Sequence, residues 1–304
     1  MYYSCLHTHS TFCDGQDSIE NLCRRAYEKG LVSIGFSSHA PIYRKTGFRT
    51  DWHIQEDRLE AYLDTVRRVR RQWEGKIRVF LGLEIDYIPD LMGPGDLDYH
   101  DLGLDYRIGS VHYVIPPQGA PFAVDDSPEV VEKGIREGFA HDPEALMEAY
   151  WDTMEGMIHA GGFDILGHTD LIKKNNSPDQ RKKWFSLESP AYQRRMQGIA
   201  DTIGASSLVV EVNTGGLNRY KLPDTYPSCA LLQRLQVKQV PVIITADAHR
   251  AEDLDGHYEE ARQTLLQAGY THAVLFEGKK NGVPQWKEAP LAESPRGRFT
   301  PARV

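Results

Sequence analysis

The stretch SCLHTHSTFCDG, residues 4–15, decides the fold of this chain. A short apolar run ends there in His7 and His9, and Asp14 follows in the same stretch. Side chains alternate along an extended strand, so two histidines separated by one residue point to the same side and can chelate one ion. The stretch therefore predicts a metal-binding first strand. Later strands that end in the same way are expected to contribute further ligands.

Apolar runs of strand-like composition alternate with amphipathic stretches along the chain. The runs predict strands at Tyr3–His7, Val32–Ser37, Ile77–Ile85, Tyr106–Tyr113, Phe163–Gly167, Leu208–Asn213, Val242–Ala246 and Ala273–Phe276. The amphipathic stretches predict helices at Ile19–Lys29, Glu56–Trp73, Pro143–Ala160, Pro190–Ile203, Ser228–Leu235 and Ala251–Ala268. Repeated strand–helix units indicate a parallel sheet covered by helices. About seven or eight units in 304 residues favour one α/β barrel over an open sheet.

Side chains suited to metal binding stand near the ends of these predicted strands. The C-terminal ends of all strands in a parallel barrel converge on one face. Nine candidate ligands would meet there: His7, His9, Asp14, His39, Glu84, His112, His168, Asp247 and His249. One histidine at a strand end is more often structural than a ligand, but chance is a poor explanation for the joint pattern. The other histidines are expected to be surface or packing residues, with His53 the one that merits attention.

The size of the ligand set predicts more than one ion. Catalytic zinc keeps about three protein ligands and an open position, so nine ligands imply two or three ions. Glu84 can bridge two of them, because its negative charge offsets their mutual repulsion. Mixed imidazole and carboxylate ligands suit zinc, iron or manganese, and the sequence does not choose among these three metals.

Net charge, the length of the apolar runs and the cysteine spacing indicate which class of protein this is. The chain has 35 Lys+Arg and 43 Asp+Glu, and its net charge of −8 favours a small-molecule partner over nucleic acid. Its apolar runs fall short of the roughly 18 residues of a spanning helix, and its first residues do not resemble a signal peptide. The four cysteines form no CxxC pair. We expect a cytoplasmic protein without membrane association, and the oligomeric state stays open.

Seven segments, in order, resemble those of the PHP (polymerase and histidinol phosphatase) superfamily from the N-terminus to about residue 277. They are HTHSTFCDG, GFSSHAP, LGLEIDY, GSVHY, DILGHTDLI, EVNTGGL and ITADAH. The HTHS and DAH motifs are shared across the superfamily, so they indicate the fold and the metal site but not the substrate. The combination of GSVHY, an insertion with FAVDDSPE, GHTDLIK and EVNTGGL is narrower. It resembles the histidinol-phosphatase branch.

This resemblance implies a distorted (β/α)7 TIM-like barrel of the PHP type that holds three metal ions. The implied ligand sets are His7, His9, Glu84 and Asp247 for one ion, Asp14, His39 and His249 for a second, and Glu84, His112 and His168 for a third. Asp14 stands where many members have a third early histidine, which leaves the metal at the second site open. Glu84, Asp247 and His249 would take part in catalysis through the metal centre.

The expected reaction is hydrolysis of a phosphate monoester. Metal ions lower the pKa of bound water to about 7 and neutralise phosphate oxygens, so a hydroxide bridging two ions can attack phosphorus in line. The resemblance implies L-histidinol phosphate as substrate, with L-histidinol and phosphate as products, in histidine biosynthesis. The main alternative is a PHP phosphoesterase or exonuclease acting on nucleotides or DNA ends. A metal-dependent amidohydrolase and a noncatalytic barrel are further alternatives. The Asp-Ala-His motif weighs against the amidohydrolase, and the intact set of nine ligands weighs against the noncatalytic barrel.

Cations near the pocket are expected to bind the phosphate. The candidates are Lys173, Lys174 and Arg219, with Asn213 and the glycines that follow it forming an anion-binding nest. A solvated surface charge is an equally good explanation for each lysine.

The cationic end of the substrate calls for carboxylates opposite the metals. Asp125 and Asp126 are the candidates, although a solvent-facing loop with a helix cap at Ser127 explains them as well.

Two stretches lack strand or helix periodicity, at residues 41–51 and 116–141, and they are predicted to be loops that act as lids or substrate walls. Residues 1–277 are expected to form the barrel domain, and residues 278–304 a partly mobile C-terminal extension. The basic tail from Ser294 to Val304 is expected to be mobile or to act as a late clasp.

Overall fold

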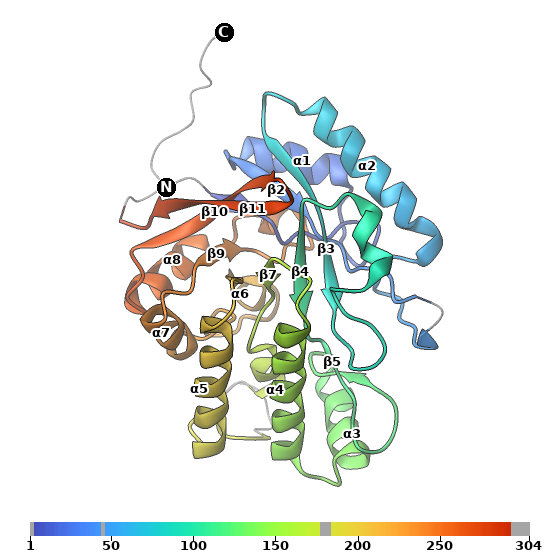
Figure 1. The fold of residues 1–304 in the computed structure, drawn as a ribbon, viewed down its shortest axis with the longest axis vertical. Coiled ribbons are helices and arrows are strands. Elements are labelled where there is room, and N and C mark those ends of the chain that lie inside the picture. Colours follow the sequence, from blue (N-terminus) through green and yellow to red (C-terminus); the bar gives the residue numbers. More distant parts are fainter. Residues whose placement is uncertain (1–2, 44–45, 177–183, 293–304) are drawn as a thin grey trace.

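Seven parallel strands form the central sheet of the computed structural model, which describes residues 3–43, 46–176 and 184–292 (Figure 1). The strands follow one another in chain order: β1 (Ser4–Cys5), β2 (Ser33–Phe36), β3 (Arg78–Asp86), β4 (Tyr106–Ser110), β7 (Ile165–Leu166), β8 (Val209–Asn213) and β9 (Val242–Thr245). Beyond β1 and β9, Thr8 and Ala248 form a parallel bridge, and the amide of His9 donates to the carbonyl of Ala248 at 2.8 Å. The sheet therefore nearly closes, which confirms the distorted (β/α)7 barrel.

Helices connect these strands and pack against the sheet (Figure 1). They are α1 (Ile19–Glu28), α2 (Leu59–Gln72), α3 (Pro128–Gly138), α4 (Pro143–Ala160), α5 (Pro190–Gly204), α6 (Gly215–Tyr220), α7 (Cys229–Val237) and α8 (Tyr258–Gln267). Short 3₁₀ helices lie at η2 (Glu56–Arg58), η3 (Leu97–Leu102), η4 (Leu171–Asn176) and η5 (Ala251–Asp253). All six predicted helices are present, with small shifts at their ends, and the last is divided between η5 and α8. Among the described residues, no helix is long and apolar enough to cross a membrane.

Helix α1 shows why the sequence forms these elements where it does. The Ser18 side chain accepts a hydrogen bond from the amide of Asn21, which caps the first turn. One stripe of the helix is buried, at Ile19, Leu22, Cys23 and Ala26. Their spacing of three and four residues places them on one face, which packs toward the sheet. Gly30 follows at a φ of 77°, a conformation that glycine adopts without a steric penalty.

The floor of the barrel interior is closed by an antiparallel hairpin of β10 (His272–Lys280) and β11 (Val283–Pro290). Phe276 of β10 lies 5.7 Å from Tyr106 and 4.8 Å from Phe80, measured between ring centroids. The ring of Tyr106 fills the space beside Gly82, where an added Cβ would approach it to 2.5 Å. The interior below the strand ends is therefore packed with side chains.

Two predictions about elements need correction. Ala273–Phe276 is a strand, but it belongs to the hairpin and not to the barrel sheet, because its apolar side chains cover the barrel floor. The stretch 116–141 is not a loop throughout, because β6 (Phe122–Ala123) pairs with β5 (Tyr113–Val114) and α3 follows from its cap at Ser127. Val131 and Ile135 are one helical turn apart and are buried on one face of α3, a helical spacing that the prediction did not take into account.

The expected boundary at residue 277 falls inside β10, so residues 278–290 continue the hairpin. The tail from Ser294 to Val304 lies outside the described residues.

Candidate metal centre

All nine predicted ligands meet at the C-terminal ends of the barrel strands. Within this set and Asp86, four overlapping groups have ligand atoms within 4.8 Å of one another: His9, Asp14, His39 and His249; His7, Glu84 and His168; His7, His9 and Asp247; and His39, Asp86 and His112. Eight of the nine are buried, and Asp14 is the exposed one. The barrel therefore delivers these side chains to one place, as the parallel topology predicts.

Glu84 is the centre of the cluster. Its Oε2 lies 2.9 Å from Nδ1 of His39 and 3.1 Å from Nε2 of His7. Its Oε1 accepts a hydrogen bond from Ser110 at 2.7 Å and lies 2.8 Å from Nε2 of His168 and 3.6 Å from Nε2 of His112. One carboxylate thus faces imidazoles from four strands. This is the arrangement required of a residue that bridges two cations.

Several buried atoms of this cluster approach one another as ion pairs but have no partner in hydrogen-bond geometry. They include Nε2 of His7, Nε2 of His9, Nδ1 of His39 and Oε2 of Glu84. An unsatisfied buried polar atom costs about 1–3 kcal/mol, so four of them in one spot would be strongly destabilising. A divalent cation accepts lone pairs from imidazole nitrogen and carboxylate oxygen, and it would satisfy all four. The donor set therefore fits a transition metal such as zinc.

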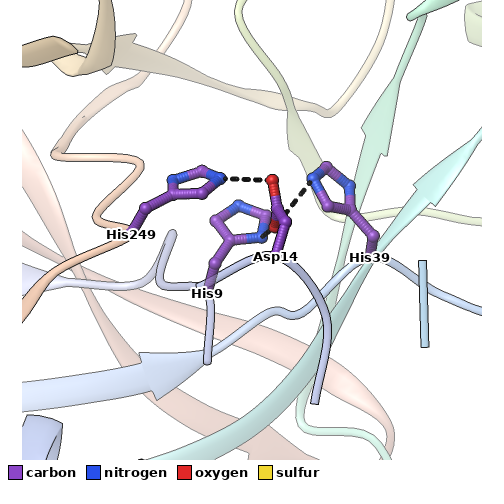
Figure 2. A group of neighbouring side chains, drawn as sticks. All are labelled: His9, Asp14, His39 and His249. Atoms are coloured by element: carbon purple, nitrogen blue, oxygen red, sulfur yellow. Dashed lines mark hydrogen bonds and ion pairs between the residues drawn. The ribbon is translucent and has the colours of Figure 1, made fainter. Parts of the chain in front are cut away.

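A second group lies nearer the solvent (Figure 2). Asp14 turns toward three imidazoles: its Oδ2 is 3.0 Å from Nε2 of His249, and its Oδ1 is 3.6 Å from Nδ1 of His9 and 3.8 Å from Nε2 of His39. The rings of His9 and His249 are stacked, with centroids 4.1 Å apart. His9 also points Nε2 at Asp247, at 3.2 Å, so it lies between this group and the inner one.

The electrostatics keep the carboxylates ionised. Burial raises the pKa of Glu84, but His7, His39 and the other imidazoles outweigh burial and hold this pKa well below its usual range. Burial likewise opposes ionisation of Asp247, and Arg219 and His7 reverse the shift, so the pKa of Asp247 is also far below normal. Both side chains therefore carry the negative charge that attracts cations.

The surroundings shift the pKa values of two imidazoles of the cluster in opposite directions. Burial, together with the nearby His249, lowers the pKa of His9 to about 4, which leaves its ring neutral and able to bind metal at neutral pH. Burial also disfavours the charged form of His112, but Asp86 and Glu84 prevail and raise the pKa of His112 to about 10. Metal binding at His112 must therefore displace a proton.

Two carboxylates that sequence reasoning did not assign support the ligands. Glu211 is fully buried; it lies 2.8 Å from Nδ1 of His7 and accepts hydrogen bonds from the backbone amide of His168, at 2.6 Å, and from Asn213, at 2.9 Å. Asp86 lies 2.8 Å from Nδ1 of His112. The alternation of side chains along a strand was the signal that could have found them. Asp86 follows Glu84 by two residues, and Glu211 precedes Asn213 by two, so each lies on the same strand face as a predicted site residue.

The predicted phosphate-binding residues divide between the site and its surroundings. Arg219 lies at the site, with Nη2 2.7 Å from Asp247 and Nη1 2.9 Å from His249. Asn213 lies beneath it, where its side chain donates to Glu211 and accepts from the amide of Gly215 at 2.7 Å.

The two lysines behave differently. Lys174 reaches the site and pairs with Asp125, with Nζ 3.5 Å from Oδ2. The structure does not bring Lys173 to the cavity, because this side chain is buried elsewhere. It donates to Asp170 at 3.0 Å and to the carbonyl of Thr225 at 2.6 Å.

An open cavity of about 360 Å³ lies above the ligands. Part of its lining consists of candidate ligands together with Arg219. The rest of the lining, which we call the wall, combines two aromatic side chains with charged ones and consists of Asp51, Trp52, Ala123, Asp125, Asp126, Lys174 and Tyr220. Both predicted lid stretches thus contribute to the wall, which agrees with a role as substrate walls, and their movement stays a prediction.

Comparison with known proteins places the chain in a family. The model of the PHP domain matches residues 6–215, more than half of the chain, and the protein belongs to this family. Among curated relatives, the "Probable histidinol-phosphatase" of Deinococcus radiodurans is 27% identical over 278 residues, covering 90% of this chain and 96% of the relative. The "Histidinol-phosphatase" of Bacillus subtilis is 25% identical over 265 residues, covering 83% and 96%.

A solved structure confirms the fold. It is that of a histidinol phosphate phosphatase from Lactococcus lactis complexed with zinc, L-histidinol and phosphate. It aligns with a TM-score of 0.64 at 18% identity, covering 91% of this chain and 99% of the other.

Proposed function

We propose that this protein is a metal-dependent phosphatase that hydrolyses L-histidinol phosphate to L-histidinol and phosphate. The observation that carries the proposal is a single cavity whose lining combines two kinds of groups. Metal-type ligands and Arg219 form one part of the lining, and carboxylates with aromatic side chains form the wall. The substrate has matching groups, a phosphate together with an ammonium and an imidazole. Both full-length relatives described above carry the histidinol-phosphatase name.

The nine strand-end side chains would hold two or three divalent ions, which we propose to be zinc, iron or manganese. His7, His9, Glu84 and Asp247 would bind one ion, and Asp14, His39 and His249 a second, while Glu84 with His112 and His168 would bind a third. Bound ions of this kind supply a water molecule that ionises near neutral pH and positive charge for the phosphate oxygens. Glu84, Asp247 and His249 would then act in catalysis by holding these ions in place.

Arg219 is proposed to bind the phosphate. Its half-buried guanidinium lies against Asp247 and His249, and its Nε has no hydrogen-bond partner. Burial disfavours its charge, but Asp247 outweighs burial, so the pKa of Arg219 is raised and its charge is permanent. A fixed guanidinium with an unused N–H donor can pair with phosphate oxygens in a defined orientation.

The wall of the cavity is proposed to select the cationic end of the substrate. Asp125 is largely buried, and although burial raises its pKa, Lys174 and His112 keep that pKa lowered, so the carboxylate stays ionised. The wall contains three carboxylates, those of Asp51, Asp125 and Asp126, and one lysine, which pairs with Asp125. An ammonium group would be attracted to this excess of negative charge, and Trp52 and Tyr220 provide flat faces for an imidazole.

The test compares substrates at matched metal content. We expect kcat/KM for L-histidinol phosphate to exceed that for propyl phosphate by at least about 100-fold, because a site built to pair a charge rejects analogues that lack it. Asp125→Asn should lower kcat/KM for L-histidinol phosphate about tenfold or more and leave propyl phosphate hydrolysis unchanged. Glu129→Gln, an exposed residue of α3, serves as the control. A preference for a nucleotide or a DNA end would overturn the proposal.

A further inference from the structure

A chain of polar side chains runs from the wall of the cavity to a candidate ligand. Nε2 of His53 lies 2.8 Å from Oδ2 of Asp86, and Oδ1 of Asp86 lies 2.8 Å from Nδ1 of His112. At the outer end, Nδ1 of His53 meets the hydroxyl of Thr50. His53, Asp86 and His112 are all buried, so water does not compete for these contacts. The chain connects residues 50–53, next to the cavity wall, with the end of β4.

The donors and acceptors along this chain fit one assignment. An ionised carboxylate only accepts hydrogen bonds, so Asp86 requires a proton on Nδ1 of His112 and on Nε2 of His53. Nδ1 of His53 is then an acceptor, and the hydroxyl of Thr50 donates to it. Oδ1 of Asp86 also accepts the backbone amide of His112 at 3.3 Å, which holds ring and backbone together.

Once a metal displaces the proton on Nε2 of His112, this assignment leaves that nitrogen with a free lone pair. That nitrogen faces Oε1 of Glu84 at 3.6 Å, so the lone pair is directed into the proposed metal centre. Both oxygens of Asp86 are already used by imidazole nitrogens. Asp86 is therefore suited to act behind a ligand, although its position within 4.8 Å of ligand atoms of His39 and His112 would also allow it to bind an ion.

We propose that Asp86 is a positioning residue that holds His112 in the metal-binding tautomer, and that His53 holds Asp86 in turn. The inference rests on the proposed metal-dependent function. It gives His53, which the sequence pattern placed among packing residues, a role in the site. Trp52 packs against His53, with ring centroids 4.0 Å apart, and lies 5.3 Å from His112, so the segment that lines the cavity also packs against the candidate ligand.

The decisive variant is Asp86→Asn. An amide presents one acceptor and one donor group, so one of the two imidazoles loses its acceptor and must change tautomer. Loss of such an outer partner lowers metal affinity about 10- to 100-fold. We therefore expect Zn²⁺ affinity at one site to fall by this factor in a competition titration with a chromophoric chelator. The number of ions bound at saturating Zn²⁺ should stay that of the wild type.

Nitrogen-15 NMR of histidine-labelled protein provides the second readout. In the zinc-loaded wild type the His112 ring should carry its proton on Nδ1, and in zinc-loaded Asp86→Asn this signal should be lost or shifted. Because glutamine retains a donor to Asp86, the Zn²⁺ affinity of His53→Gln should lie between that of the wild type and that of His53→Phe. Glu260→Gln breaks the exposed His257–Glu260 pair, at 3.0 Å, and should change neither readout. If Asp86→Asn does not fold, the two His53 variants carry the test.

Two results would overturn the proposal. Loss of a whole ion at saturating Zn²⁺ in Asp86→Asn would make Asp86 a ligand. Wild-type affinity and an unchanged His112 tautomer in Asp86→Asn, or wild-type affinity in His53→Phe, would leave the chain with a purely structural role. The titration uses no substrate, so it can succeed even if L-histidinol phosphate is not hydrolysed. That outcome would contradict the proposed function alone.

Discussion

Replacing Glu84 by Gln is expected to damage the site more than replacing any one histidine. Its carboxylate lies within 3.1 Å of nitrogens of His7, His39 and His168, in full burial. Glutamine keeps the shape, removes the charge and adds donor hydrogens where acceptors are needed. Breaking a buried charge pair by removing one partner costs about 3–5 kcal/mol. At about 1.4 kcal/mol per tenfold, this corresponds to roughly a 10²- to 10⁴-fold loss of metal affinity.

The assay is equilibrium dialysis against buffered free Zn²⁺, followed by elemental analysis and measurement of kcat/KM on the same samples. Single variants His39→Gln and His168→Gln should each lose less metal and less activity than Glu84→Gln, because each removes one ligand and no charge. Glu60→Gln, on the exposed side of α2, is the matched control. If Glu84→Gln binds as many ions as the wild type, with equal affinity and rate, the bridging role is refuted.

Three other predictions concern single residues. Arg219→Lys should raise KM and lower kcat/KM about tenfold or more in steady-state assays with L-histidinol phosphate, because a lysine cannot replace the two-pronged guanidinium; unchanged constants would exclude a phosphate contact. Phe276→Ala should lower the free energy of unfolding by about 3–5 kcal/mol in urea, since it opens a cavity under the barrel, while metal content stays that of the wild type. In metal-free protein, His112 has a pKa raised to about 10, so the stability it contributes is fully present below its unfolded pKa of about 6.5 and is lost as pH rises through 10. The difference in unfolding free energy between wild type and His112→Gln should shrink over that range, and a difference that grows would contradict the sign.

The barrel was predictable because local pattern and topology agree. Each of the seven barrel strands overlaps one of the predicted runs, and Val209–Asn213 and Val242–Thr245 are buried along their whole length. The meeting of the nine candidate ligands followed from their places at strand ends, since a parallel barrel gathers those ends. The hairpin was missed because Ala273–Phe276 has the same composition as a barrel strand, and its antiparallel partner depends on contacts far apart in the sequence.

The surroundings of the ligands were harder to predict. Glu211 and Asp86 look like ordinary strand residues until the structure shows which imidazole each one meets. Lys173 and Lys174 are adjacent in sequence, yet one turns to Asp170 and the other to the cavity. The direction of a long side chain depends on its tertiary neighbours, which a sequence pattern does not contain.

Stepwise metal reconstitution tests the central claim most directly. The protein is stripped with a chelator, Zn²⁺, Mn²⁺ or Fe²⁺ is added in fractions of one equivalent, and phosphate release from L-histidinol phosphate is measured together with bound metal. We predict no hydrolysis by the stripped protein, activity that appears with the second ion per chain, and a higher kcat/KM for L-histidinol phosphate than for bis(p-nitrophenyl) phosphate. Hydrolysis by the stripped protein, full activity with one ion or fewer, or preference for the diester would contradict the account.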